Sequence, residues 1–123
     1  HQSMNCRGSS KTGYGLEAYT ASNCQGVSID GQGIHATIAT GCIGTSSSAT
    51  TNQPGIWAGV SVSNSSGEGK PGIQAVGSAS FCVGKATVAG GDAINALKAF
   101  SCQAITGNIV VTGAGAGNFN TGP

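Results

Sequence analysis

Residues 92–102 read DAINALKAFSC, and this stretch decides the fold class that we expect. Asp92 is suited to a helix N-cap, because its carboxylate can accept hydrogen bonds from the free amides of a first helical turn. Apolar residues follow with the spacing of one helical face, namely Ala93, Ile94, Ala96, Leu97 and Phe100. We therefore predict a helix over residues 92–100 that runs into Cys102.

The segments around this helix are predicted to form a second helix and several strands. Residues 14–23 (YGLEAYTASN) form the second, short helix. Apolar and polar residues alternate over 34–43 (IHATIATGCI) and 56–63 (IWAGVSVS), as is typical of half-buried strands. Further strands are expected within 73–83 and 105–112. This order predicts an α+β fold, an α/β sandwich with a mainly antiparallel sheet and two helices on one face. No internal repeat is expected.

The length of 123 residues suits one domain. We predict a single domain over 1–112 and a flexible C-terminal tail over 113–123, where GAGAGNFNTGP has no periodic pattern. A chain that begins with His1 is what removal of a leader would leave, so we expect a secreted protein. Asn64 opens an N-glycosylation sequon, Asn-Ser-Ser. The apolar runs are too short to span a membrane.

Five cysteines are spread along the chain: Cys6, Cys24, Cys42, Cys82 and Cys102. The absence of a C-x-x-C pair, and of a histidine at finger-like spacing, disfavours a structural zinc site. Widely spaced cysteines in a short secreted chain are typical of disulfides, each of which stabilises by about 2–4 kcal/mol. We therefore expect a disulfide-stapled monomer. The cysteine left over is either a buried thiol or a link between two copies. The alternative is five reduced core cysteines in a cytosolic protein.

Only nine side chains are charged, and the formal net charge is +1. The basic residues are scattered, at Arg7, Lys11, Lys70, Lys85 and Lys98. A surface that follows phosphate groups normally carries clustered lysine and arginine, so nucleic acid is not an expected partner.

Residues 5–10 (NCRGSS), which follow the apolar Met4, resemble the start of the mature Kp-four killer toxins of smut fungi. Members of that family have an α/β sandwich fold in which a helix runs into a cysteine that is bridged to the first cysteine. The resemblance therefore implies a Cys6–Cys102 disulfide. It also implies a Cys42–Cys82 disulfide, and it leaves Cys24 unpaired.

The same resemblance implies a secreted effector that inhibits growth of competing fungi or plant cells. Its partner would be a cell-surface target such as an ion channel or a cell-wall component, with an effect on calcium uptake. Such proteins act by binding, so we expect no catalytic residues and no cofactor. The target-binding residues that we predict are Arg7, Lys11, Trp57, Lys70 and Lys85. This chain has no Lys or Arg between Lys11 and Lys70, which weakens electrostatic attraction to an acidic channel mouth.

Two other functions remain open. The first is a non-toxic glycan- or metal-binding module, for which an exposed Trp57 would mark a binding patch. The second is a small copper enzyme that uses His1 and His35, because amine and imidazole nitrogens suit copper. The chain has only four carboxylates, at Glu17, Asp30, Glu68 and Asp92, and their positions give no sign of a paired-acid hydrolase.

Overall fold

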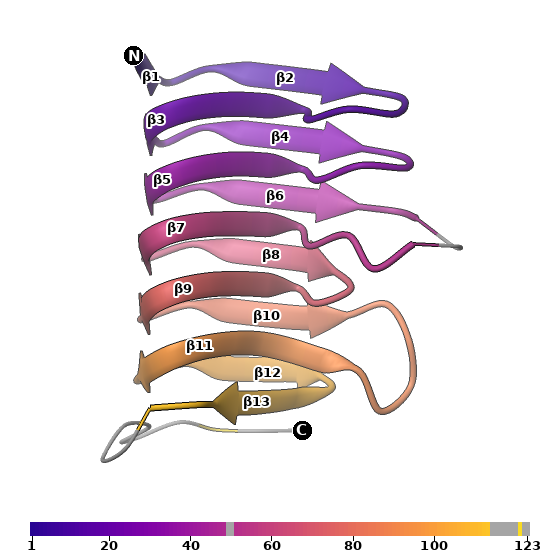
Figure 1. The fold of residues 1–123 in the computed structure, drawn as a ribbon, viewed down its shortest axis with the longest axis vertical. Coiled ribbons are helices and arrows are strands. Elements are labelled where there is room, and N and C mark those ends of the chain that lie inside the picture. Colours follow the sequence, from indigo (N-terminus) through magenta and orange to yellow (C-terminus); the bar gives the residue numbers. More distant parts are fainter. Residues whose placement is uncertain (49–50, 114–120, 122–123) are drawn as a thin grey trace.

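A computed structural model of the chain describes residues 1–48, 51–113 and 121, and in it the backbone winds as a β-solenoid (Figure 1). The described strands are β1 (Gln2–Met4), β2 (Arg7–Ser10), β3 (Leu16–Ser22), β4 (Gln25–Ser28), β5 (Ile34–Thr40), β6 (Ile43–Ser46), β7 (Ile56–Ser63), β8 (Ser66–Gly69), β9 (Ile73–Ser80), β10 (Val83–Ala86), β11 (Asp92–Phe100), β12 (Gln103–Thr106) and β13 (Asn108–Val111). Odd-numbered strands form one sheet, in the order β1-β3-β5-β7-β9-β11-β13. Even-numbered strands form the other, in the order β12-β10-β8-β6-β4-β2. Each coil therefore adds one strand to each sheet.

One corner of every coil has the same backbone conformation. The residue that leads from the odd-numbered sheet into the even-numbered sheet has a positive φ, between 47° and 62°, at Asn5, Asn23, Gly41, Asn64, Phe81 and Ser101. Glycine and asparagine tolerate this left-handed conformation best. The next residue is a cysteine in every coil except one, where it is Ser65. The recurrence of this corner shows that the chain is built from a repeating unit, so the expectation of no internal repeat is wrong.

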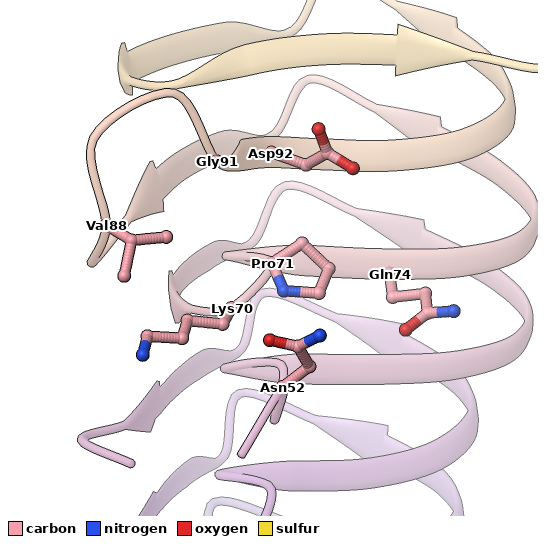
Figure 2. Close-up of a pocket in the computed structure, with 7 residues that line it drawn as sticks. All are labelled: Asn52, Lys70, Pro71, Gln74, Val88, Gly91 and Asp92. Atoms are coloured by element: carbon pink, nitrogen blue, oxygen red, sulfur yellow. The ribbon is translucent and has the colours of Figure 1, made fainter. Parts of the chain in front are cut away.

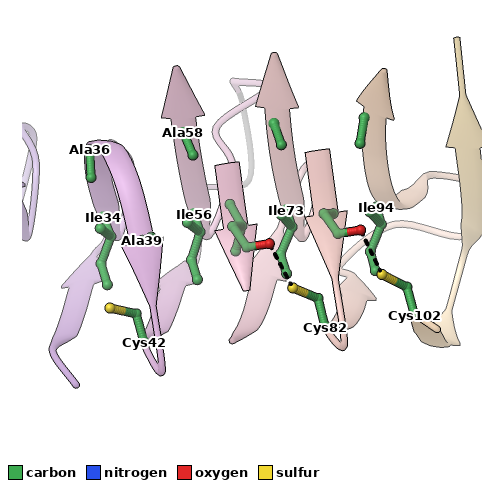
Figure 3. Packing of buried hydrophobic residues seen from close by; sticks show 14 of the residues in the cluster. Ile34, Ala36, Ala39, Cys42, Ile56, Ala58, Ile73, Cys82, Ile94 and Cys102 are labelled. Atoms are coloured by element: carbon green, nitrogen blue, oxygen red, sulfur yellow. Dashed lines mark hydrogen bonds between the residues drawn. The ribbon is translucent and has the colours of Figure 1, made fainter. Parts of the chain in front are cut away.

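The core lies between the two sheets and is built from stacked rows of small and branched side chains. Ile34, Ile56, Ile73 and Ile94 are fully buried and stack in adjacent strands (Figure 3). In-register stacking of identical residues lets each isoleucine cover the apolar surface of the next, and burial of such a side chain stabilises by about 1.5–3 kcal/mol.

Opposite the isoleucine row, the even-numbered sheet presents glycines because the two sheets are very close there. A Cβ added at Gly44 would fall inside the contact distance of the Gly55 carbonyl oxygen and lie 2.5 Å from Cγ1 of Ile56. An added Cβ would likewise meet a carbonyl oxygen and an isoleucine Cγ1 at Gly26, Gly67 and Gly84. The thinness of the solenoid therefore depends on the absence of a side chain at this position.

The two predicted helices are wrong, because both segments are strands, β3 and β11. In β11 the inward side chains are Ile94, Ala96 and Ala99, with two exposed residues between the last two. A register shift between Ala96 and Lys98 causes this change from a spacing of two to a spacing of three. A bulged strand thus imitates helical spacing. Asp92 opens a strand and caps no helix.

The predicted α/β sandwich is also wrong in the direction of its strands. It was expected to have a mainly antiparallel sheet, but every described strand pair is parallel. The strand predicted over 56–63 is confirmed as β7. Residues 34–43 hold β5 and the first residue of β6, and residues 105–112 hold parts of β12 and β13, which Gly107 separates with a φ of 91°. Apart from Gly113 and Thr121, the tail predicted over 113–123 lies outside the described residues.

The predicted disulfides are wrong, because none of the five cysteines forms one. Adjacent coils are about 4.8 Å apart, and a disulfide needs Cα atoms closer than about 7 Å. Cys6 and Cys102 are five coils apart, which places them about 24 Å from each other. Cys42 and Cys82 are separated by the coil of Ser65, which places them about 10 Å apart. The described part of the chain also contains no helix that could cross a membrane.

Candidate functional site

The outer face of the odd-numbered sheet carries a stack of three rings. His35 on β5 and Trp57 on β7 are register partners, and their ring centroids are 4.4 Å apart with planes 7° from parallel. Tyr14, just before β3, covers the other side of His35 with a centroid distance of 4.5 Å. The parallel register places side chains of neighbouring coils directly above one another, which is why these rings stack.

Hydrogen bonding fixes the middle ring of this stack. Nδ1 of His35 lies 2.7 Å from Oε1 of Gln32, which can only accept, so Nδ1 is the donor. The other ring nitrogen, Nε2, is then left as an acceptor. Within the described residues, neither the indole N–H of Trp57 nor the hydroxyl of Tyr14 has a hydrogen-bond partner. The faces between these three rings cover one another, so the stack offers ring edges and the polar atoms on them.

A cavity of about 360 Å³ opens on the side of the loops that follow the even-numbered strands (Figure 2). Its lining is mixed, with two amides, one cation, one carboxylate and a few apolar groups: Asn52, Gln74, Lys70, Asp92, Pro71, Val88 and Gly91. The volume is at the lower end of the range for small-ligand pockets, about 300–1,000 Å³.

Gln74 joins the cavity to the ring stack. It lines the cavity, and it is the register partner of Trp57 on the neighbouring strand β9. Because His35 covers the Trp57 face directed toward β5, the opposite face is directed toward β9 and Gln74. Asp92 is held at the cavity by Asn95, whose Nδ2 donates to Oδ2 of Asp92 over 3.1 Å. A ligand in the cavity would meet amides and a carboxylate, and Trp57 lies one strand away from the Gln74 amide.

The five predicted target-binding residues do not form one surface. Arg7 lies on β2 and Lys85 on β10, with three strands of the even-numbered sheet between them. Lys85 pairs with Glu68 over 3.0 Å, and this ion pair lines a second cavity of about 340 Å³. Lys11 is exposed in the loop after β2. Of the five, Lys70 lines the first cavity, and Trp57 is the register partner of Gln74, which also lines it.

The two histidines proposed for copper are separated. His1 precedes β1, and its carbonyl accepts hydrogen bonds from the amides of Tyr19 and Thr20. His35 lies two strands away on β5, where it belongs to the ring stack. Within the described residues, no group of three or more His, Cys, Asp or Glu side chains is placed to hold a metal ion. Asn64, the predicted glycosylation site, is exposed at a corner.

Four of the cysteines are buried and form an inward-facing ladder away from the candidate site, namely Cys24, Cys42, Cys82 and Cys102. The thiol of Cys82 donates to the carbonyl of Ser80 over 3.2 Å and to that of Val62, in the preceding coil, over 3.6 Å (Figure 3). Contact with the thiol of Cys102, together with burial, raises the pKa of Cys82 above its ordinary value. Burial raises the pKa of Cys42. The contact with Cys82 lowers the pKa of Cys102 to about 7, because the Cys102 thiolate accepts from the Cys82 thiol. The inward packing of these side chains suits a structural role.

Comparisons of the chain with protein-family models, curated proteins and solved structures find no match. The Kp-four resemblance therefore rests on residues 5–10, since the helix and the disulfides that it implied are absent. The growth-inhibiting activity that it implied stays a prediction. Sequence reasoning singled out Trp57 and Lys70 but missed Tyr14, Asn52 and Gln74 as site residues. Each cysteine directly follows a corner residue, as in Asn5-Cys6 and Asn23-Cys24, and this recurrence could have been used to align the coils. The alignment would have shown that Gln74 and Trp57 are neighbours.

Proposed function

We propose that the chain is an extracellular, non-enzymatic module that binds carbohydrate, and that its partner is a glycan of a cell wall or cell surface. The observation that carries this proposal is the register pairing of Trp57 with Gln74, which lines the cavity together with Asn52 and Asp92. Sugars combine apolar C–H faces with a rim of hydroxyl groups. An aromatic face packs against the first, and amides and a carboxylate bind the second.

Binding without catalysis is favoured by the composition of the cavity. Asp92 is the only carboxylate among the described residues that line it. Glycoside hydrolysis ordinarily needs two carboxyl groups, about 5–10 Å apart across the scissile bond. A single acid next to amides suits recognition of adjacent sugar hydroxyls, since it accepts from them while the amides both donate and accept.

Tryptophan fluorescence tests this proposal directly, because Trp57 is the only tryptophan. Neutral mono- and disaccharides of several classes are titrated into the protein, and at least one is expected to change the emission saturably. Asp92→Ala is expected to weaken binding about tenfold or more, as a hydrogen bond to a charged group contributes about 1.5–3 kcal/mol.

Gln74→Ala and Gln25→Ala form a matched pair of variants for the same titration. Both glutamines are half-buried strand residues, but Gln25 lies on β4 in the other sheet. Gln74→Ala is expected to weaken sugar binding, whereas Gln25→Ala leaves it unchanged. If no sugar binds, or if both variants behave alike, the proposed function is wrong.

A further inference from the structure

We propose that the ligand is a neutral oligosaccharide of three or more sugar units that extends from the cavity along the ring stack of Trp57, His35 and Tyr14. This inference rests on the proposed function and adds the length, the direction and the charge of the ligand. One end of the oligosaccharide occupies the cavity. The rest crosses the coils parallel to the solenoid axis.

Register provides a continuous track for such a chain. Gln74 at the cavity is followed, strand by strand, by Trp57 and His35, and then by the ring of Tyr14. Steps between neighbouring strands are about 4.8 Å, so the track is about 14 Å long. This is too long for a monosaccharide and fits several linked pyranose rings.

The polar atoms on this track match sugar hydroxyls. Nε2 of His35 is an acceptor because Nδ1 is bound to Gln32. The indole N–H of Trp57 and the hydroxyl of Tyr14 have no hydrogen-bond partner among the described residues. Because the rings are stacked face to face, donors and acceptors lie on the ring edges along the track. A chain of sugars, whose hydroxyls both donate and accept, can satisfy each of them.

Charge selects a neutral chain over an anionic one. Glu17 is the register partner of His35, and Asp92 lies at the cavity, so a carboxylate stands at each end of the track. Lys70 is the only cation among the described residues that line the cavity. Stacked rings can also hold nucleic-acid bases, but a phosphate backbone requires several cations. An oligosaccharide without acidic groups is the occupant that these charges favour.

Calorimetry with a length series tests the inference. The sugar found to bind by fluorescence is supplied as mono-, di-, tri- and tetrasaccharide. Affinity for the wild-type protein is expected to rise at least about tenfold from the mono- to the tetrasaccharide. Tyr14→Ala is expected to keep the monosaccharide affinity and to lose several-fold of the gain with length.

Tyr19→Ala is the matched control, because Tyr19 is a second exposed tyrosine of the same coil, lies on β3 and takes no part in the stack. It is expected to keep the full gain with length. Equal affinity for the mono- and tetrasaccharide, with Asp92→Ala abolishing both, would overturn the extended track and leave the proposed function standing. Failure of every sugar to bind would overturn the proposed function and the track together.

Discussion

At the scale of single residues, Gly44 shows why a side chain is excluded from the even-numbered sheet. Gly44→Ala places a Cβ against the Gly55 carbonyl and Ile56, so the backbone must move. We expect a loss of about 1–3 kcal/mol or more in the free energy of unfolding. Gly59→Ala is the control, since the nearest atom to its added Cβ is a Trp57 ring carbon at 3.5 Å. Urea denaturation measures both, and equal stabilities would contradict the close sheet contact.

The buried thiols make a second prediction at this scale, which concerns pH. Burial raises the pKa of Cys42 in the folded protein, so this thiol holds its proton above the ordinary thiol pKa of about 8.5, where the unfolded chain releases it. The contribution of Cys42 to stability is therefore fully present below that pH and falls as pH rises above it, by up to about 1.4 kcal/mol per pH unit.

Denaturation at pH 7.5, 8.5 and 9.5 measures this slope. Cys42→Ala is expected to make the fall shallower, because one of the thiols that keep their protons is removed. Cys6→Ser is the matched control, because it removes an exposed thiol and leaves the buried thiols in place. The same slope between pH 8.5 and 9.5 in the wild-type protein and in Cys42→Ala would contradict burial of the Cys42 thiol.

At the scale of the element, the corners set the conformation of each coil. Phe81 has a φ of 52° and is 65% exposed, although asparagine holds the same corner in three other coils. The left-handed conformation costs a residue other than glycine roughly 1–2 kcal/mol, and asparagine tolerates it better. Phe81→Asn is therefore expected to stabilise the protein by about 0.5–1 kcal/mol, because asparagine removes part of the cost of the left-handed conformation.

Phe100→Asn controls for the loss of an exposed phenylalanine, because Phe100 lies in strand β11. It is expected to give no gain, since asparagine is disfavoured in strands. Thermal unfolding followed by circular dichroism measures both variants. A Phe81→Asn variant that is less stable than the wild-type protein would contradict the corner conformation.

The elements differ in how far the sequence alone could predict them. β7 alternates apolar and polar residues over 56–63 and was predicted with its correct bounds. β11 has its inward side chains at a spacing of two and then three, which is compatible with a helix, so its type was wrong. Local spacing cannot separate a bulged strand from a short helix, whereas the pairing of β11 with β9 and β13 can.

At the scale of the whole molecule, the repeat was hidden by its own variation. The corner residues 5, 23, 41, 64, 81 and 101 are separated by 18, 18, 23, 17 and 20 residues. Ser65 also replaces the expected cysteine in one coil. Five unevenly spaced cysteines suggest disulfides when Ser65 is not counted with them. Once the coils are aligned, the five cysteines and Ser65 occupy the same position in successive coils. The candidate site was missed for the same reason, since Gln74 and Trp57 are neighbours only once the coils are aligned.

Stacking of successive coils in register underlies both the binding cavity and the ring stack, because each combines residues of neighbouring coils. Spin labels at Cys6 and at Ser101→Cys, two exposed corner positions, measure this stacking by pulsed electron paramagnetic resonance. Five steps of about 4.8 Å predict a separation of about 24 Å between the labelled backbone positions. A separation well below this value, or a Cys6 that cannot be labelled because it is bonded to Cys102, would contradict the solenoid.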